Sequence, residues 1–332
     1  MAISTAFQTK QNTNVIIGTE ATMGTAALAT ANSIEMPVTD YSMDEIHKHS
    51  LSVAPPRTGS GSFTQSDDMV KWQRHDRMFD ISITFHATAQ AINRVCLALF
   101  EDGTSPNTLQ GDMPDTTSFV DGVSNTVPVT LWFENSAHAG QGTDMYFTSC
   151  LCTGLSLSGD INSNGGVVMC TATFQTAYAP TEAALTFSGG GGTHTVISDQ
   201  ITMFNMHDLT VETLNEQDLL LYSFELSIAR PVNRVGFDNS SNFKPQGYAL
   251  GGYEVNGSLT CKRDAESTDA IDTSTPVALA LSAGDVFQID APKVMVDNSA
   301  ISTDDDGWKQ TIPFICTYSG ATTSTIVEIK TA

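Results

Sequence analysis

Alternation of apolar and polar residues constrains the fold of this chain more than any other feature. Segments with this period are bounded by Gly, Asn, Asp and Ser, which is the pattern of β-strands joined by turns. The pattern is clearest in residues 81–87, 128–134, 145–158, 166–176, 219–229, 252–261, 287–297, 309–318 and 325–330. The sequence therefore predicts a mainly β, antiparallel architecture.

Helical spacing occurs in two places. Apolar side chains recur every three to four positions through residues 89–100, directly after Thr88, whose side chain is suited to an N-cap. A shorter and weaker helical pattern covers residues 265–271. We expect one helix lying on a sheet at the first place and a helical turn at the second.

The same order of elements occurs twice. In each half a strand precedes a helix, a further strand and a long hairpin, which turns near residues 164–166 in the first half and near 305–307 in the second. This order predicts two similar antiparallel β-sandwich or half-barrel domains, residues 1–180 and 181–332. The four glycines within residues 188–193 are compatible with a linker between the domains or with the tip of a long hairpin.

Each half also contains a long, irregular, polar segment between strands, residues 44–78 and 231–252. Loops of this length inside compact domains are usually functional. We therefore expect each domain to carry a short flanking helix and a long projecting inter-strand loop.

Charge is distributed unevenly along the chain. Lys and Arg total 15 against 37 Asp and Glu, a net charge of −22, and no basic residue lies between residues 95 and 229. Seven basic residues lie in the two long loops: Lys48, Arg57, Lys71, Arg74, Arg77, Arg234 and Lys244. Basic projections on an acidic body favour a head-to-tail contact between copies, and such contacts build rings or filaments. The alternative is that exposed loops simply collect charges of both signs.

Trp72 is the candidate anchor of that contact. It lies in the first loop between Lys71 and Arg74. Aromatic residues beside basic ones are enriched at the centres of protein interfaces. Local packing within the loop is the alternative, whereas Trp132 is expected in the core.

Composition argues against several other functions. An acidic surface does not bind nucleic acid through counterion release. The sequence has no hydrolase, phosphate-loop or dinucleotide motif, and the His47–His49 pair lacks a third ligand, so we expect no catalytic residue, metal or cofactor. The six cysteines are expected to be reduced and buried. No apolar stretch is long enough for a membrane anchor, and the N-terminus lacks a secretion signal, so we expect folding in a cytoplasm.

Two segments carry a resemblance to a known family: NVIIGTEATMGTAA at residues 14–27, and YALGGYEVNGSLTCKRD at residues 248–264, where a projecting loop returns into a strand. The paired late hairpins at residues 146–175 and 287–318 extend it across the chain. In these features the chain resembles the two-domain tail tube (major tail) proteins of long-tailed bacteriophages.

The resemblance implies a structural virion protein. Several domains would close an inner β-barrel into a ring, three chains giving pseudo-sixfold symmetry, and rings would stack through the two long loops into a hollow tube. The N-terminal segment would be an arm reaching a neighbour. Tape-measure, tail-tip and tail-terminator proteins would be its partners, in a virion tail assembled in the host cytoplasm. The excess acid would line the channel, so that DNA passes without specific binding.

Other roles remain open on sequence alone. A capsid decoration or baseplate protein could use a similar β scaffold. A carbohydrate-binding module is less favoured because aromatic residues make up only 8% of the chain and are dispersed. An enzyme is the least favoured reading, because no candidate nucleophile has a visible partner.

Overall fold

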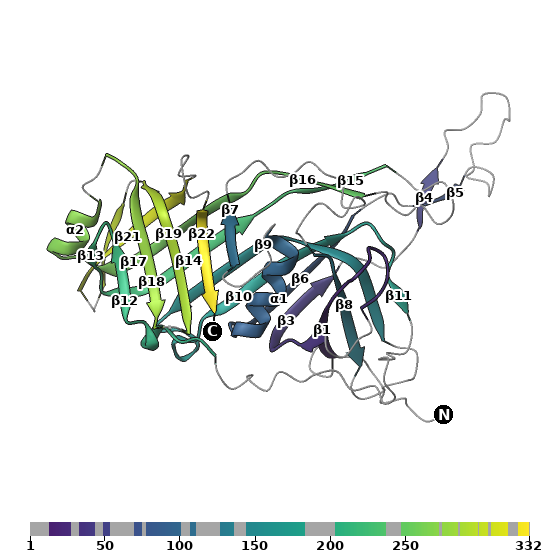
Figure 1. The fold of residues 1–332 in the computed structure, drawn as a ribbon, viewed down its shortest axis with the longest axis horizontal. Helices are drawn as coiled ribbons and strands as arrows, with labels where there is room; N and C mark the ends of the chain where they lie inside the picture. The colour runs from purple at the N-terminus through teal and green to yellow at the C-terminus, as the bar shows by residue number, and fades with distance from the viewer. Residues whose placement is uncertain are drawn as a thin grey trace.

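The structure is a computed structural model, and its secondary structure repeats the order of elements across two halves (Figure 1). It describes residues 13–27, 33–43, 49–53, 70–74, 78–100, 107–110, 127–135, 144–182, 203–236, 247–271, 274–284, 286–297, 299–304, 307–317 and 325–331. The first half contains β1 (Thr13–Thr19), β2 (Ser33–Glu35), β3 (Val38–Met43), β4 (His49–Val53), β5 (Val70–Arg74), β6 (Phe79–His86), α1 (Ala89–Leu99), β7 (Asn107–Gln110), β8 (Val129–Asn135), β9 (Met145–Asp160), β10 (Met169–Thr176) and β11 (Thr181–Glu182).

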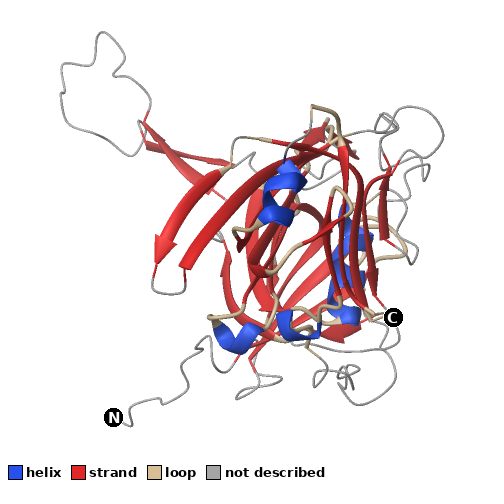
Figure 2. Cartoon of the chain, turned by 90° about the vertical axis from the view of Figure 1, so that its left-hand side faces the viewer, coloured by secondary structure: helices blue, strands red, loops and turns tan. Residues whose placement is uncertain are grey.

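The second half follows the same plan. It contains β12 (Val211–Leu214), β13 (Gln217–Asp218), β14 (Leu221–Ala229), β15 (Val232–Val235), β16 (Gly247–Leu250), β17 (Glu254–Lys262), α2 (Ala265–Ile271), β18 (Val277–Ala283), β19 (Phe287–Val296), β20 (Ala300–Asp304), β21 (Gly307–Cys316) and β22 (Thr325–Thr331). Strands make up most of the body, with the helices against them (Figure 2). The prediction of a mainly β, antiparallel fold is confirmed.

Both helices lie where the spacing of apolar residues predicted them, and short polar side chains cap their N-termini. The Thr88 hydroxyl caps α1 by accepting a hydrogen bond from the Ala91 amide at 3.4 Å. The Asp264 carboxylate accepts one from the Ser267 amide at 3.0 Å at the start of α2. Short polar side chains are preferred at such positions because they satisfy amides that have no partner within the helix.

The two long polar segments contain more structure than the sequence suggested. The first contains the antiparallel pair β4–β5, and the second contains β15–β16. Figure 1 shows β4 and β5 beyond the body of the sheet, and β15 and β16 along one margin of it. The description of these segments as irregular is therefore wrong for their described residues, because runs of four or five residues are too short to show a clear period of two among polar neighbours.

Strand pairing shows that the two halves are structural repeats. Five hydrogen-bonded pairs in one half have counterparts in the other: β3–β6 and β14–β17, β6–β10 and β17–β21, β9–β10 and β19–β21, β8–β9 and β18–β19, β1–β8 and β12–β18. The division into domains at residues 180 and 181 falls beside residues that the structure does not describe, and it stays a prediction.

The correspondence extends to single residues. The Thr84 and Thr171 hydroxyls lie 3.1 Å apart across β6 and β10, and the Thr260 and Thr311 hydroxyls lie 3.2 Å apart across β17 and β21. Those four threonines therefore fix the alignment of one half on the other, with Thr84 matching Thr260 and Thr171 matching Thr311.

Irregularities in pairing are repeated as well. The register of β3 shifts between Val38 and Asp40, and that of β14 shifts between Leu221 and Ser223. Both shifts fall at the same point relative to the matched threonines, because Asp40 pairs with Thr84 and Ser223 pairs with Thr260. A β-bulge at the same place in both halves is a conserved feature of the repeat.

A single hydrophobic core extends through both halves. Its buried side chains include Phe85, Phe147, Leu157, Leu226 and Phe287. Trp132 is buried in a small separate cluster, as predicted. All six cysteines are buried, and none is bonded to another. Burial raises the pKa of the Cys152 thiol to about 12.

Glu20 is a buried carboxylate that ties the segment after β1 to β9. One of its oxygens accepts hydrogen bonds from the Thr130 hydroxyl and the Ser149 amide, both at 2.7 Å. The other accepts from the Ser149 hydroxyl at 2.9 Å and the Gly24 amide at 3.2 Å. Burial outweighs these hydrogen bonds and raises the pKa of Glu20 above 4.5.

Replacing Glu20 by glutamine is expected to lower the free energy of unfolding by about 1–3 kcal/mol, because either orientation of the amide sets an NH₂ group against a buried backbone amide. The raised pKa makes the Glu20 contribution to stability largest below its ordinary value of 4.5, and that contribution is lost as pH rises through the higher pKa of the folded state. Urea unfolding between pH 7 and 5 should show the gap between wild type and variant widening on acidification. A gap that narrows would contradict this account.

Candidate assembly interface

The two halves join edge to edge through β9 and β14. These strands pair antiparallel over seven residue pairs, with Leu157 opposite Leu226 and Ser158 opposite Glu225. Leu157 and Leu226 are buried in the core, whereas Ser158 and Glu225 are exposed on the other face. The join between the halves is therefore an ordinary sheet pairing with one apolar and one polar face.

The polar face continues across the strands on both sides of the join. One row crosses five strands as Thr84, Thr171, Ser156, Ser227 and Asn256. The acidic residues on this face include Asp40, Asp80, Asp160, Glu225 and Glu254, and the basic residues include Lys262 and Lys309. This face of the sheet is thus rich in hydroxyl groups, with a moderate excess of acid.

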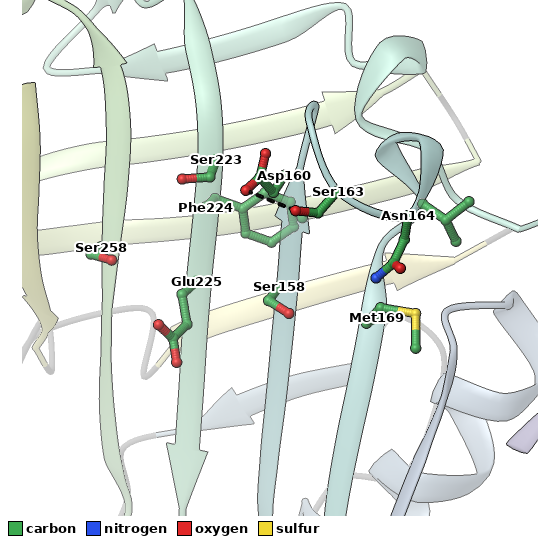
Figure 3. Close-up of a pocket in the computed structure, with 11 residues that line it drawn as sticks. Ser158, Asp160, Ser163, Asn164, Met169, Ser223, Phe224, Glu225 and Ser258 are labelled. Carbon is green, nitrogen blue, oxygen red and sulfur yellow. Dashed lines mark hydrogen bonds between the residues drawn. The ribbon is translucent and has the colours of Figure 1, made fainter. Parts of the chain in front are cut away.

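A shallow hollow of about 220 Å³ lies on the polar face at the join (Figure 3). Hydroxyl and carboxylate side chains from β9, β14 and β17 line it, among them Ser158, Glu225 and Ser258. The Ser163 hydroxyl donates to the Asp160 carboxylate at 3.3 Å, which stabilises the turn at the edge of the hollow.

The hairpin of β15 and β16 forms a second contact between the halves. Tyr248 of β16 is 1% exposed and packs with Leu151 and Ala177 of the first half. The Ala177 amide donates a hydrogen bond of 3.0 Å to the Tyr248 hydroxyl. Burial raises the pKa of that hydroxyl, so it stays neutral. The second hairpin is therefore docked on the first half by a buried aromatic residue.

Arg230 fixes the base of the same hairpin. It is 1% exposed, and its guanidinium donates to the Leu99 carbonyl at the end of α1 at 3.1 Å and to the Gly251 carbonyl at 3.4 Å. The guanidinium also lies 4.5 Å from the centre of the Tyr253 ring, whose hydroxyl donates to Leu99 at 2.9 Å. A cation near the C-terminus of a helix is favourably placed relative to the helix dipole.

Two strand edges lie at opposite ends of the series of strands. Among the described strands, β3 pairs only with β6, and β20 pairs only with β21. Ile301 of β20 is 49% exposed, although its position in the repeat matches the buried Leu157. Open edges of this kind are templates for pairing with another chain.

Only a few of the basic residues predicted to contact another copy lie close together in the described part of the structure. Lys71, Trp72 and Arg74 lie on β5 of the projecting hairpin. Arg234 lies on β15, half-buried and opposite Tyr248. The remaining candidates lie outside the described residues: Lys48, Arg57, Arg77 and Lys244.

Sequence reasoning missed Arg230, Tyr248 and Tyr253, which connect the hairpin and its base to the first half. Tyr248 and Tyr253 lie within the segment that carries the family resemblance, but nothing in the sequence indicates that Tyr248 is buried or that Tyr253 is partly buried. Arg230 directly follows a strand with a strong period of two. Its position at the end of that strand is the one feature of the sequence that could have pointed to a structural role.

Neither a metal site nor a membrane helix is found in the described part of the chain. Its His, Cys, Asp and Glu side chains form no group of three that could hold a metal ion. No helix in the same residues is long and apolar enough to cross a membrane.

Comparison with known proteins identifies the family. A family model described as phage tail tube protein matches residues 10–316 of the 332. The chain belongs to this family. No curated protein matches the sequence. The tail tube family is a structural family rather than an enzyme family, and membership implies self-assembly into a tube, contact with other tail proteins and a place in the virion tail.

Proposed function

We propose that this tail tube protein forms rings that stack into a hollow tube through which DNA leaves the capsid. The observation that carries the proposal is the edge-to-edge join of β9 and β14, which links two repeated halves in one sheet and leaves β3 and β20 as edges at the two ends. Repeats that join in this way continue around a ring when the last edge of one copy meets the first edge of the next.

Three copies would place six repeats around the ring and give pseudo-sixfold symmetry. The polar face of the sheet would line the channel, with Asp80, Glu225 and Glu254 among its acidic groups. Hydroxyl groups and an excess of carboxylates offer phosphates no strong electrostatic attraction, so DNA would pass without being held.

Electron microscopy of the purified protein across rising concentration and salt tests the proposal. Salt screens the repulsion between subunits of net charge −22. Stacked rings or tubes with a central channel are the expected result. Featureless single subunits under all conditions, also after addition of the tail-tip complex and tape-measure protein, would overturn the proposal.

Reversing Lys71, Arg74 and Arg77 to glutamate is expected to abolish tube growth while the chain stays folded, because the first hairpin would then repel an acidic neighbour. Electron microscopy measures tube formation, and circular dichroism checks the fold. A matched variant that exchanges Lys and Arg at these positions keeps the charge and should still form tubes. Unaltered tubes from the glutamate variant would refute the role of these basic residues.

A further inference from the structure

We infer that the β3 edge of one chain pairs with the β20 edge of a second copy in the register that β14 and β9 use within the chain, and that the β4–β5 hairpin docks on that copy. The inference rests on the proposed ring assembly and specifies its contact residue by residue. We take the occupant to be another copy, because β3 and β20 lie at opposite ends of the series of strands and repeat the two strands that pair within the chain.

The internal repeat identifies β20 as the counterpart of the end of β9. Thr171 pairs with Ser156 of β9, and its match Thr311 pairs with Ala300 of β20. Ile301 and Ser302 therefore occupy the positions of Leu157 and Ser158, the residues of β9 that face β14 at the join.

The same alignment identifies β3 as the counterpart of β14. Ser42 pairs with Ser82 of β6, as Glu225 pairs with Ser258 of β17, and the next pairs along are Met43–Ile81 and Leu226–Gly257. Transfer of the β9–β14 register thus sets Met43 of one copy opposite Ile301 of the next, and Ser42 opposite Ser302.

The residues at these positions fit the transfer: Met43 is half-buried, and Ile301, Ser42 and Ser302 are exposed. Met43 and Ile301 would form the apolar pair that Leu226 and Leu157 form within the chain. Ile301 is 49% exposed where Leu157 is fully buried, so pairing would cover an apolar side chain that the single chain leaves in water. Ser42 and Ser302, both exposed, would lie on the polar face.

The hairpins support the same arrangement. Trp72 of β5 lies opposite Leu51, and Tyr248 of β16 lies opposite Arg234, at the same distance from the base of each hairpin. The first-half residues Leu151 and Ala177, which receive Tyr248, correspond to Met295 and Thr317 in the second half.

Two apolar residues of this corresponding surface are exposed in the single chain. Met295 is 43% exposed, and its neighbour Ile315 across the strands is 53% exposed. The Thr317 amide already donates a hydrogen bond of 2.8 Å to the Lys293 carbonyl. It is therefore not available to donate to a docked side chain, unlike the Ala177 amide, which donates to Tyr248. Tryptophan suits this position because its indole N–H donates a hydrogen bond and needs no donor from the surface. At Ala177, by contrast, the backbone amide needs an acceptor, and the tyrosine hydroxyl provides one.

One pair in the transferred register is unfavourable. Asp40 would lie opposite Asp304, where the join within the chain sets Ser223 opposite Asp160. Like charges directly across two strands oppose pairing. Pairing between copies should therefore be weaker at low salt than the join within the chain.

A disulfide scan tests the register. The full-length double variant Ser42→Cys, Ser302→Cys is assembled, oxidised and run on non-reducing gels. Cross-strand pairs bring Cα atoms to about 4.5–5.5 Å, within the range that a disulfide spans. We expect a ladder of covalent oligomers that ends at the ring size, with a peptide joining residues 42 and 302. The native cysteines do not interfere because all six are buried.

The matched control is Ser42→Cys with Thr303→Cys. A shift of one residue turns the second thiol to the opposite face, so cross-linking should fall roughly tenfold or more. Equal cross-linking of both variants, or tubes visible by microscopy with no link in the first variant, would overturn the inference while the proposed function stands. Absence of any assembly by the wild type would overturn both.

Discussion

A lysine in place of Ile301 is expected to leave the chain folded and to abolish ring assembly. Ile301 is half exposed in the single chain, so an ammonium group stays hydrated there. In the inferred junction it would be buried opposite Met43, and an unpaired buried charge costs about 3–5 kcal/mol. That cost weakens each junction about 100-fold to 4,000-fold, since 1.4 kcal/mol is a factor of ten.

Analytical ultracentrifugation across protein concentration measures this effect. Val286→Lys is the matched control, because Val286 is 44% exposed and lies in the turn before β19, away from the β20 edge. The control variant should form rings at the same protein concentrations as the wild type. If the Ile301 variant assembled as readily as the control, β20 would not be a buried edge in the assembly.

Truncation of Arg230 to alanine is expected to have the largest effect on the chain itself. The guanidinium donates to carbonyls of Leu99 and Gly251 in a buried site, and alanine leaves a cavity and loses charge-assisted hydrogen bonds. Together these losses amount to about 3–5 kcal/mol of the free energy of unfolding. The base of the β15–β16 hairpin should then exchange its amide hydrogens faster.

Urea unfolding and hydrogen exchange of β15 and β16 measure the two parts of that effect. Arg234→Ala is the matched control, since Arg234 is on the same hairpin but only half-buried. We expect it to cost less than about 1 kcal/mol, as is usual for partly exposed sites. Similar losses for both variants would show that Arg230 does not hold the hairpin in a special way.

Much of the fold was predictable because its signals are local. Alternation shows which face of a strand is buried, and capping residues such as Thr88 mark where a helix begins. The pairing of β9 with β14 was not predictable, because Leu157 and Leu226 are far apart in sequence and alternation does not identify the neighbouring strand. The sequence showed the repeat only as a recurring order of elements. The strand registers were needed to align individual residues, such as Thr84 with Thr260.

The contact between rings that the basic residues suggested stays a prediction. Basic charge directed attention to the long segments, and these do contain the two hairpins. Charge did not identify the contacts that dock the second hairpin, because these depend on buried aromatic packing at Tyr248 and on a buried cation at Arg230. Burial of such residues is set by the partner surface, which lies in another part of the chain.

The covalent link between the two repeats also affects the kinetics of assembly. Because β9 and β14 belong to one chain, their pairing is intramolecular, and the second partner is present at an effective concentration far above that of a separate subunit. In the proposed ring, every second junction would thereby be completed during folding, at any protein concentration. Only the remaining junctions would depend on encounters between molecules, so weak contacts could control growth without loss of the ring's continuity.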